Sequence, residues 1–146
     1  MSKDQKRNLT GIHVDQYEFW SKLQQTNPSV YKNDIQGLQF YDLPITKNGW
    51  IIRLDIYFLK QHYKKKGSLT IAVMNDDKNL FDTKKEPLMD YFEKEGLSSN
   101  VDLYKNKYHR MIVAINNNDY FLENHQNWGN AITWFNDHIT NLISML

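Results

Sequence analysis

The segment WIIRLDIYFL, residues 50–59, decides the fold because its side chains alternate between apolar and mixed character. An extended chain places successive side chains on opposite sides. One side of this segment carries Ile52, Leu54, Ile56 and Phe58. The other side carries Ile51, Arg53, Asp55 and Tyr57. This alternation predicts a β-strand with one face in the core and the other turned outward.

The two segments that follow predict an antiparallel partner for this strand. QHYKKKG, residues 61–67, has the polarity and terminal glycine of a turn, and SLTIAVMN, residues 68–75, is again rich in strand-forming residues. The side chains expected to point into the core are Leu69, Ile71 and Val73. If residues 61–67 form a simple turn, Asp55 lies opposite the stretch from Ala72 to Met74.

Apolar periodicity predicts a helix at each end of the chain. Residues 14–25 place Phe19 and Leu23 four positions apart, and Asp15 is a suitable N-cap. A long amphipathic helix is expected over residues 128–146, where apolar residues recur at the helical period.

A third helix is expected over residues 77–95, directly after the hairpin. Pro87 conflicts with one straight helix because proline lacks an amide hydrogen and clashes with the preceding turn. We therefore expect a kink or break near Glu86, and an end at Gly96.

Three shorter segments complete the sheet. Residues 38–45 predict a strand that Pro44 ends, and residues 100–106 and 108–116 predict a second hairpin. The order is then helix, three strands, helix, two strands, helix. It indicates an α+β fold, in which three helices cover one face of a mainly antiparallel sheet of about five strands. We expect a flexible tail at residues 1–10 and a single domain over residues 11–146.

Composition narrows the class of protein. The chain has 146 residues, of which 40% are hydrophobic, and this is enough for one core. The net charge of +1 argues against a dedicated nucleic-acid-binding protein but leaves room for a local basic patch. No cysteine is present, and no apolar run reaches the roughly 18 residues of a membrane span. We expect a cytoplasmic protein, in a bacterium or a phage-infected bacterial cell, with no membrane contact.

The acidic segment MNDDKNLFD, residues 74–82, has two possible interpretations. One is a magnesium-dependent nuclease in which Asp55 is followed by Asp76 and Lys78. In the predicted hairpin, however, Asp76 lies roughly 7–14 Å along the ladder from Asp55, too far to share an ion with ligands at about 2.1 Å. The other reading, which we favour, is the start of a helix, where an aspartate accepts bonds from free backbone amides.

The rest of the sequence offers no catalytic constellation. The five histidines lack the spacing of metal ligands, and there is no glycine-rich phosphate loop and no G-x-S-x-G motif. We therefore predict no catalytic residue, no metal ligand and no cofactor. Enzymatic activity stays an open alternative, and a non-catalytic role is favoured.

Two groups of residues are candidates for binding. The segment KQHYKKKG, residues 60–67, has the character of a nucleic-acid contact. Its candidate residues are Lys60, Tyr63, Lys64, Lys65 and Lys66. The alternative is a hairpin tip that lysines keep soluble.

A protein partner would use a different set of side chains. The candidates are Arg53, Asp55 and Tyr57 on the outward face of the central strand, together with Trp134 on the last helix. Tyrosine, tryptophan and arginine are common anchors of protein interfaces. The alternative is ordinary packing of a half-covered sheet face.

Four segments in order resemble the domain-of-unknown-function family 4268. They are YEFWSKL (residues 17–23), GWIIRLDIYF (49–58), KKKGSLTIAVMNDDKNLFD (64–82) and NWGNAITWFNDHITNLISML (127–146). The similarity extends over roughly residues 14–146. Its most specific parts are the junction from strand to NDDKNLFD and the last helix. Pro87 departs from the family, in which this helix is usually continuous.

The resemblance implies a setting but no chemistry. Members of the family usually follow restriction-endonuclease-like regions in bacterial and phage proteins, and their own activity is undefined. No nuclease segment precedes the domain here, so we expect a free-standing accessory or regulatory subunit, or a phage-encoded inhibitor.

We predict a non-catalytic module that docks on a protein or nucleoprotein partner in defence or counter-defence. The alternatives are weak direct nucleic-acid binding through the basic hairpin tip and a magnesium-dependent nuclease. The sequence is also compatible with a homodimer formed through an exposed strand edge.

Overall fold

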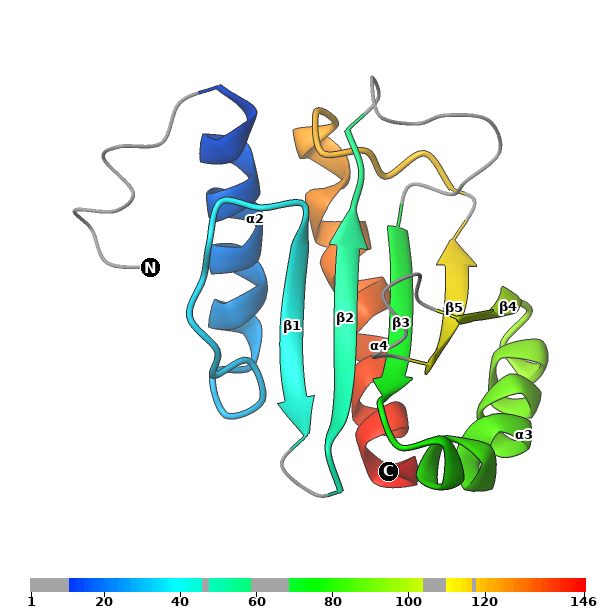
Figure 1. Ribbon diagram of the computed structural model, residues 1–146. Coiled ribbons are helices and arrows are strands. Elements are labelled where there is room, and N and C mark those ends of the chain that lie inside the picture. The colour runs from blue at the N-terminus through cyan, green and yellow to red at the C-terminus, as the bar shows by residue number, and fades with distance from the viewer. Residues whose placement is uncertain (1–10, 46–47, 59–68, 104–109, 117) are drawn as a thin grey trace.

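The computed structural model confirms the predicted α+β architecture (Figure 1). It describes residues 11–45, 48–58, 69–103, 110–116 and 118–146. The predicted tail at residues 1–10 and the predicted turn at residues 61–67 lie outside the described residues.

The elements follow one another in the predicted order. They are α2 (Ile12–Thr26), β1 (Phe40–Ile45), β2 (Trp50–Ile56), β3 (Leu69–Asn75), α3 (Lys78–Lys94), β4 (Ser98–Leu103), β5 (Arg110–Asn116), a 3-10 turn (His125–Asn127) and α4 (Trp128–Met145). The strands form one sheet in the order β1-β2-β3-β5-β4, and every neighbouring pair is antiparallel.

The three helices of the described residues pack on one face of the sheet. Figure 1 shows α4 behind the strands, α2 next to the β1 edge, and α3 beside the β3, β5 and β4 end. The core between the layers contains the aromatic residues Phe19, Trp20, Trp50, Phe81, Phe92 and Phe135. On β2 and β3 it contains Ile52, Leu54, Ile56, Leu69, Ile71 and Val73, as the alternation predicts. Among the described residues, no helix combines the length and the apolar character needed to span a membrane.

The predicted register of the first hairpin is wrong. Asp55 lies opposite Thr70, not opposite the stretch from Ala72 to Met74. The last pair before the connection is Ile56 with Leu69. The described pairing ends further from the assumed turn at residues 61–67 on the β2 side than on the β3 side, and this inequality shifts the register.

Two local boundaries also differ from expectation. Helix α2 has Gly11 as its N-cap, so Asp15 lies in the first turn and not at the cap. The Asp15 carboxylate instead contacts Nε2 of His125 at 3.1 Å. Pro44 lies inside β1, opposite Ile51, and does not end the strand. This is permitted because β1 is an edge strand, where a residue whose backbone points outward needs no amide hydrogen.

Both predicted ends of helix α3 are confirmed. In its middle the helix bends but does not break at Pro87. Asp77 is the N-cap, and its carboxylate accepts the backbone amides of Asn79 and Leu80. Gly96 has a φ of 72°, and Leu97 N donates to Phe92 O at 2.9 Å, which is the usual glycine-terminated helix end. The helix runs through Pro87 without a break, and Figure 1 shows that it changes direction along its length.

Candidate functional site

The sheet face opposite the helices, called the second face below, carries the predicted candidates of the central strand. Pairing across β1, β2, β3 and β5 arranges its side chains in three rows. The rows are Phe40, Asp55, Thr70 and Ile115; Asp42, Arg53, Ala72 and Val113; and Pro44, Ile51, Met74 and Met111. Apart from Phe40, the β1 and β2 members of the first two rows are polar, and the third row is apolar. The second face therefore presents a polar half beside an apolar half.

Arg53 is the centre of the polar half. Its Nε lies 2.7 Å from Asp42 Oδ1 and its second guanidinium nitrogen lies 3.0 Å from Asp42 Oδ2. The guanidinium carbon is also 4.1 Å from the centre of the Phe40 ring. Paired hydrogen bonds and ring stacking both use the planar shape of the guanidinium, so this side chain has a fixed orientation. Both partners of the ion pair keep about a quarter of their side-chain surface exposed, 27% for Arg53 and 28% for Asp42.

Asp55 is a desolvated carboxylate next to this pair. The Thr70 hydroxyl donates to it at 3.1 Å, and the Gln39 side-chain amide donates at 3.4 Å. Burial raises the pKa of Asp55 to about 6, although both hydrogen bonds and the charge of Arg53 act in the opposite direction. Asp55 therefore changes charge within a pH range that cells experience.

Tyr57 follows directly after β2 and completes the group. Its side chain is half-buried and interacts with the Thr70 hydroxyl. Burial raises the pKa of Tyr57, and the neighbouring charge of Asp55 adds to this rise. The structure thus brings together three of the four candidates predicted for a protein partner.

The apolar half of the second face forms its own cluster. Ala72, Met74 and Met111 are almost fully buried, and Ile51 and Val113 pack against them while partly exposed. No described helix contributes to this cluster. Strand β3 is consequently buried on both sides.

Trp134, the fourth candidate, lies elsewhere. It projects from α4 in the helical layer, where it is half-buried against the main core. Its ring centre is 5.3 Å from that of Phe135 and 5.2 Å from that of His138. It cannot act in one contact surface with Arg53 and Asp55, because the sheet lies between them.

The nucleic-acid candidates are not placed by the structure. The residues concerned are Lys60, Tyr63, Lys64, Lys65 and Lys66, all of which lie outside the described residues. Binding through this segment stays a prediction.

The acidic segment after β3 is the start of a helix. Asp77 caps α3, and Asp76 comes six positions after Thr70, the partner of Asp55. At about 3.3 Å per residue this places Asp76 roughly 20 Å along the sheet from Asp55, further than predicted. Carboxylates that far apart cannot bind one magnesium ion. Within the described part of the chain, no cluster of three histidine or acidic residues is arranged to hold a metal.

The sequence did not predict several residues that shape the second face. Asp42 and Phe40, which fix Arg53, and Gln39 and Thr70, which bind Asp55, were not predicted as site residues. The signal available was the charge pair of Asp42 and Arg53 in consecutive strands. This charge pair can be recognised only once the register that pairs β1 with β2 is known.

Comparison with known proteins gives no further guide to the site. No family model, curated protein or solved structure matches the chain. The resemblance to family 4268 therefore stays a prediction, and function has to be argued from geometry.

Proposed function

We propose that this domain is a non-catalytic module that docks on a protein or nucleoprotein partner through the second face of its sheet. The observation that carries the proposal is the one-sided placement of the helices. All three cover the same face, and the opposite face holds an oriented arginine beside partly exposed apolar side chains. A polar anchor next to an apolar patch is the usual composition of a protein interface.

The polar half and the apolar half of this surface contribute to binding in different ways. Arg53 is held by Asp42 and Phe40, so it loses little conformational freedom when a partner binds. Ile51 and Val113 supply apolar area that a partner can cover. A setting in prokaryotic or phage defence or counter-defence is the part of the proposal that rests on the family resemblance.

Site-specific photo-cross-linking tests this function. A benzoylphenylalanine at Val113 probes the second face, and the same residue at Thr140, an exposed position of α4, is the matched control. In cells that naturally encode the protein, Val113 is expected to cross-link to one defined partner and Thr140 is not. The same set of products from both positions contradicts docking through the second face.

Direct nucleic-acid binding is the second candidate, motivated by the lysine-rich segment at residues 60–67. Fluorescence anisotropy with labelled DNA and RNA at two salt concentrations tests it. A salt-sensitive affinity that is lost after replacing Lys64, Lys65 and Lys66 by glutamate supports this function. No binding by wild type near physiological salt removes it.

A further inference from the structure

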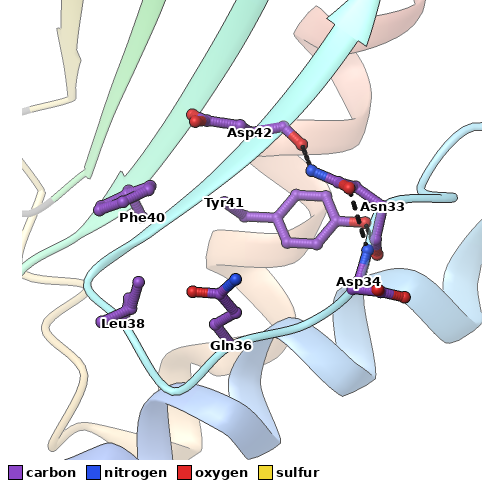
Figure 2. A pocket seen from close by; sticks show the side chains of 7 residues that line it. All are labelled: Asn33, Asp34, Gln36, Leu38, Phe40, Tyr41 and Asp42. Carbon is purple, nitrogen blue, oxygen red and sulfur yellow. Dashed lines mark hydrogen bonds between the residues drawn. The ribbon is translucent and has the colours of Figure 1, made fainter. Parts of the chain in front are cut away.

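A small pocket lies along the outer edge of β1 (Figure 2). One wall is β1 itself, and the other is the connection that leads from α2 to the sheet. The pocket is lined by Asn33, Asp34, Gln36, Leu38, Phe40, Tyr41 and Asp42. Its volume is about 90 Å³. This is far less than the several hundred cubic ångströms of a cofactor site. The pocket therefore suits one side chain, not a substrate.

The outer wall is fixed in place by hydrogen bonds. Asn33 donates its side-chain amide to the backbone oxygen of Asp42 at 2.9 Å and accepts the Tyr41 hydroxyl at its own backbone oxygen at 2.7 Å. Further along, Trp20 donates its ring N–H to the backbone oxygen of Leu38 at 2.8 Å. The pocket is thus formed before any ligand arrives, which reduces the entropy cost of binding.

The backbone of β1 also takes part. The bond from Asn33 shows that the carbonyl of Asp42 points away from β2. Backbone groups two residues apart in a strand point the same way, so the carbonyl of Phe40 also faces the connection. It offers a hydrogen-bond acceptor at the pocket.

The side chains add acceptors and an aromatic wall. Figure 2 shows Gln36 extending from the connection into the space between Leu38 and Tyr41, with the carboxylate of Asp34 turned outward at the rim. The exposed Asp34 carboxylate makes no ion pair with another described residue. Burial is the main cause that raises the pKa of Tyr41, and the charge of Asp34 adds to the rise, so this charge is felt at the phenol. A ligand with several donors and a positive charge matches this lining.

A cationic side chain is already bound at the neighbouring corner of the sheet. On the other side of the strand, Phe40 and Asp42 hold the guanidinium of Arg53 by stacking and paired hydrogen bonds. The lining of the pocket also contains aromatic and acidic residues, Phe40 and Tyr41 with Asp34 and Asp42. Arginine exploits both features because its head group is planar and carries five donors.

We propose that the pocket at the β1 edge receives an arginine side chain of the protein partner. The proposal deepens the proposed function and rests on it for the identity of the partner. The pocket adjoins the second face through Phe40 and Asp42, which belong to both. A partner that covers the second face can therefore insert an arginine at its margin, with the oxygens of Gln36 and Phe40 as acceptors and the charge of Asp34 at the rim.

The test titrates the ¹⁵N-labelled protein with N-acetyl-arginine methylamide and follows amide shifts by NMR. The citrulline analogue has the same shape without the charge and serves as the ligand control. We expect saturable shifts confined to residues 33–42 with arginine and much weaker ones with citrulline. Asp34→Asn is expected to weaken binding about threefold, as for other exposed ion pairs. Gln36→Leu is a second variant with the same expected direction.

A charge-matched variant separates a specific site from general attraction. Asp90→Asn removes an exposed carboxylate from α3 and is expected to leave the arginine titration unchanged. Equal binding of citrulline, or equal weakening by Asp34→Asn and Asp90→Asn, overturns the proposal. Because the titration contains no partner protein, its failure says nothing about docking through the second face. A failed cross-link at Val113 likewise leaves the titration result intact.

Discussion

Neighbouring residues of β2 show how differently the two faces of the sheet are built. Under the helices, Ile52, Leu54 and Ile56 are completely buried in a core of aromatic and aliphatic side chains. On the second face, Ile51, Arg53 and Asp55 stay partly exposed. The first face is stabilised by removing apolar area from water, and the second by directed polar contacts beside a small apolar cluster. Stability is therefore concentrated on the face that the helices cover.

The largest expected difference between the faces is in the cost of losing an apolar side chain. Leu54→Ala removes a fully buried side chain under the helices and is expected to lower the free energy of unfolding by about 3 kcal/mol. Ile51→Ala, three positions earlier and only partly buried, is expected to cost about 1 kcal/mol. Urea denaturation of both variants measures this difference. Equal losses contradict the view that the helix-covered face dominates stability.

Asp55 gives the second face a characteristic pH dependence. The pKa of Asp55 is about 6 in the folded chain, and we take the ordinary value of 3.8 for the unfolded chain. Between these two pH values the folded state holds a proton that the unfolded state lacks. The free energy of unfolding therefore rises as the pH falls from about 6 towards 4, and this gain is absent above pH 6. Allowing for partial exposure of Asp55, we expect an effect of about 1–2 kcal/mol.

Urea denaturation of wild type and Asp55→Asn at several pH values isolates this effect. The variant is expected to gain stability relative to wild type as the pH rises from 4 to 7. Asp90→Asn is the matched control at an exposed site of α3. A difference between wild type and Asp55→Asn that does not vary with pH contradicts a desolvated carboxylate.

His138 in the helical layer is expected to make the free energy of unfolding depend on pH in the opposite direction to Asp55, and by a smaller amount. It is buried between α3 and α4, beside Trp134, and its Nδ1 lies 2.9 Å from the Tyr91 hydroxyl. Burial lowers the pKa of His138, and the charges of Glu95 and Asp137 only partly offset this. The unfolded chain therefore binds more protons near its reference pKa of 6.5, so stability falls as the pH drops through about 6.5 and below.

Tyr91→Phe tests the contact that holds this imidazole. The variant is expected to lose about 1 kcal/mol of stability because a buried nitrogen is left without its partner. An NMR titration of the imidazole protons measures the pKa of His138 directly. Half-protonation of His138 above pH 6.5 contradicts the expected direction.

Predictions that depend on a few adjacent residues agree with the structure. Asp77 caps α3 and Gly96 ends it, because capping and left-handed backbone conformations are local properties. Asp15 was the exception. The aspartate itself fits a cap, but the helix begins one turn earlier at Gly11, and a carboxylate in the first turn is equally favourable.

Predictions that depend on pairing between distant segments agreed less well. The register of β2 with β3 required the length of their connection, which polarity alone does not specify. Pro44 was expected to end β1 because the sequence does not show that β1 lies at the sheet edge. The pocket was missed for the same reason: Asn33 and Gln36 look like residues of a solvated connection until that connection is placed beside β1.

The sequence by itself determined the order of helices and strands and the side of β2 that enters the core, because hydrophobic periodicity records burial residue by residue. It also placed Arg53, Asp55 and Tyr57 on a common outward side of that strand. Only the tertiary structure decided that Asp42 and Phe40 orient Arg53, that Thr70 and not Met74 faces Asp55, and that Trp134 lies on the other side of the sheet. These contacts join segments that are distant in sequence. Their existence depends on the lengths of connections and on the packing of whole layers, which no short pattern encodes.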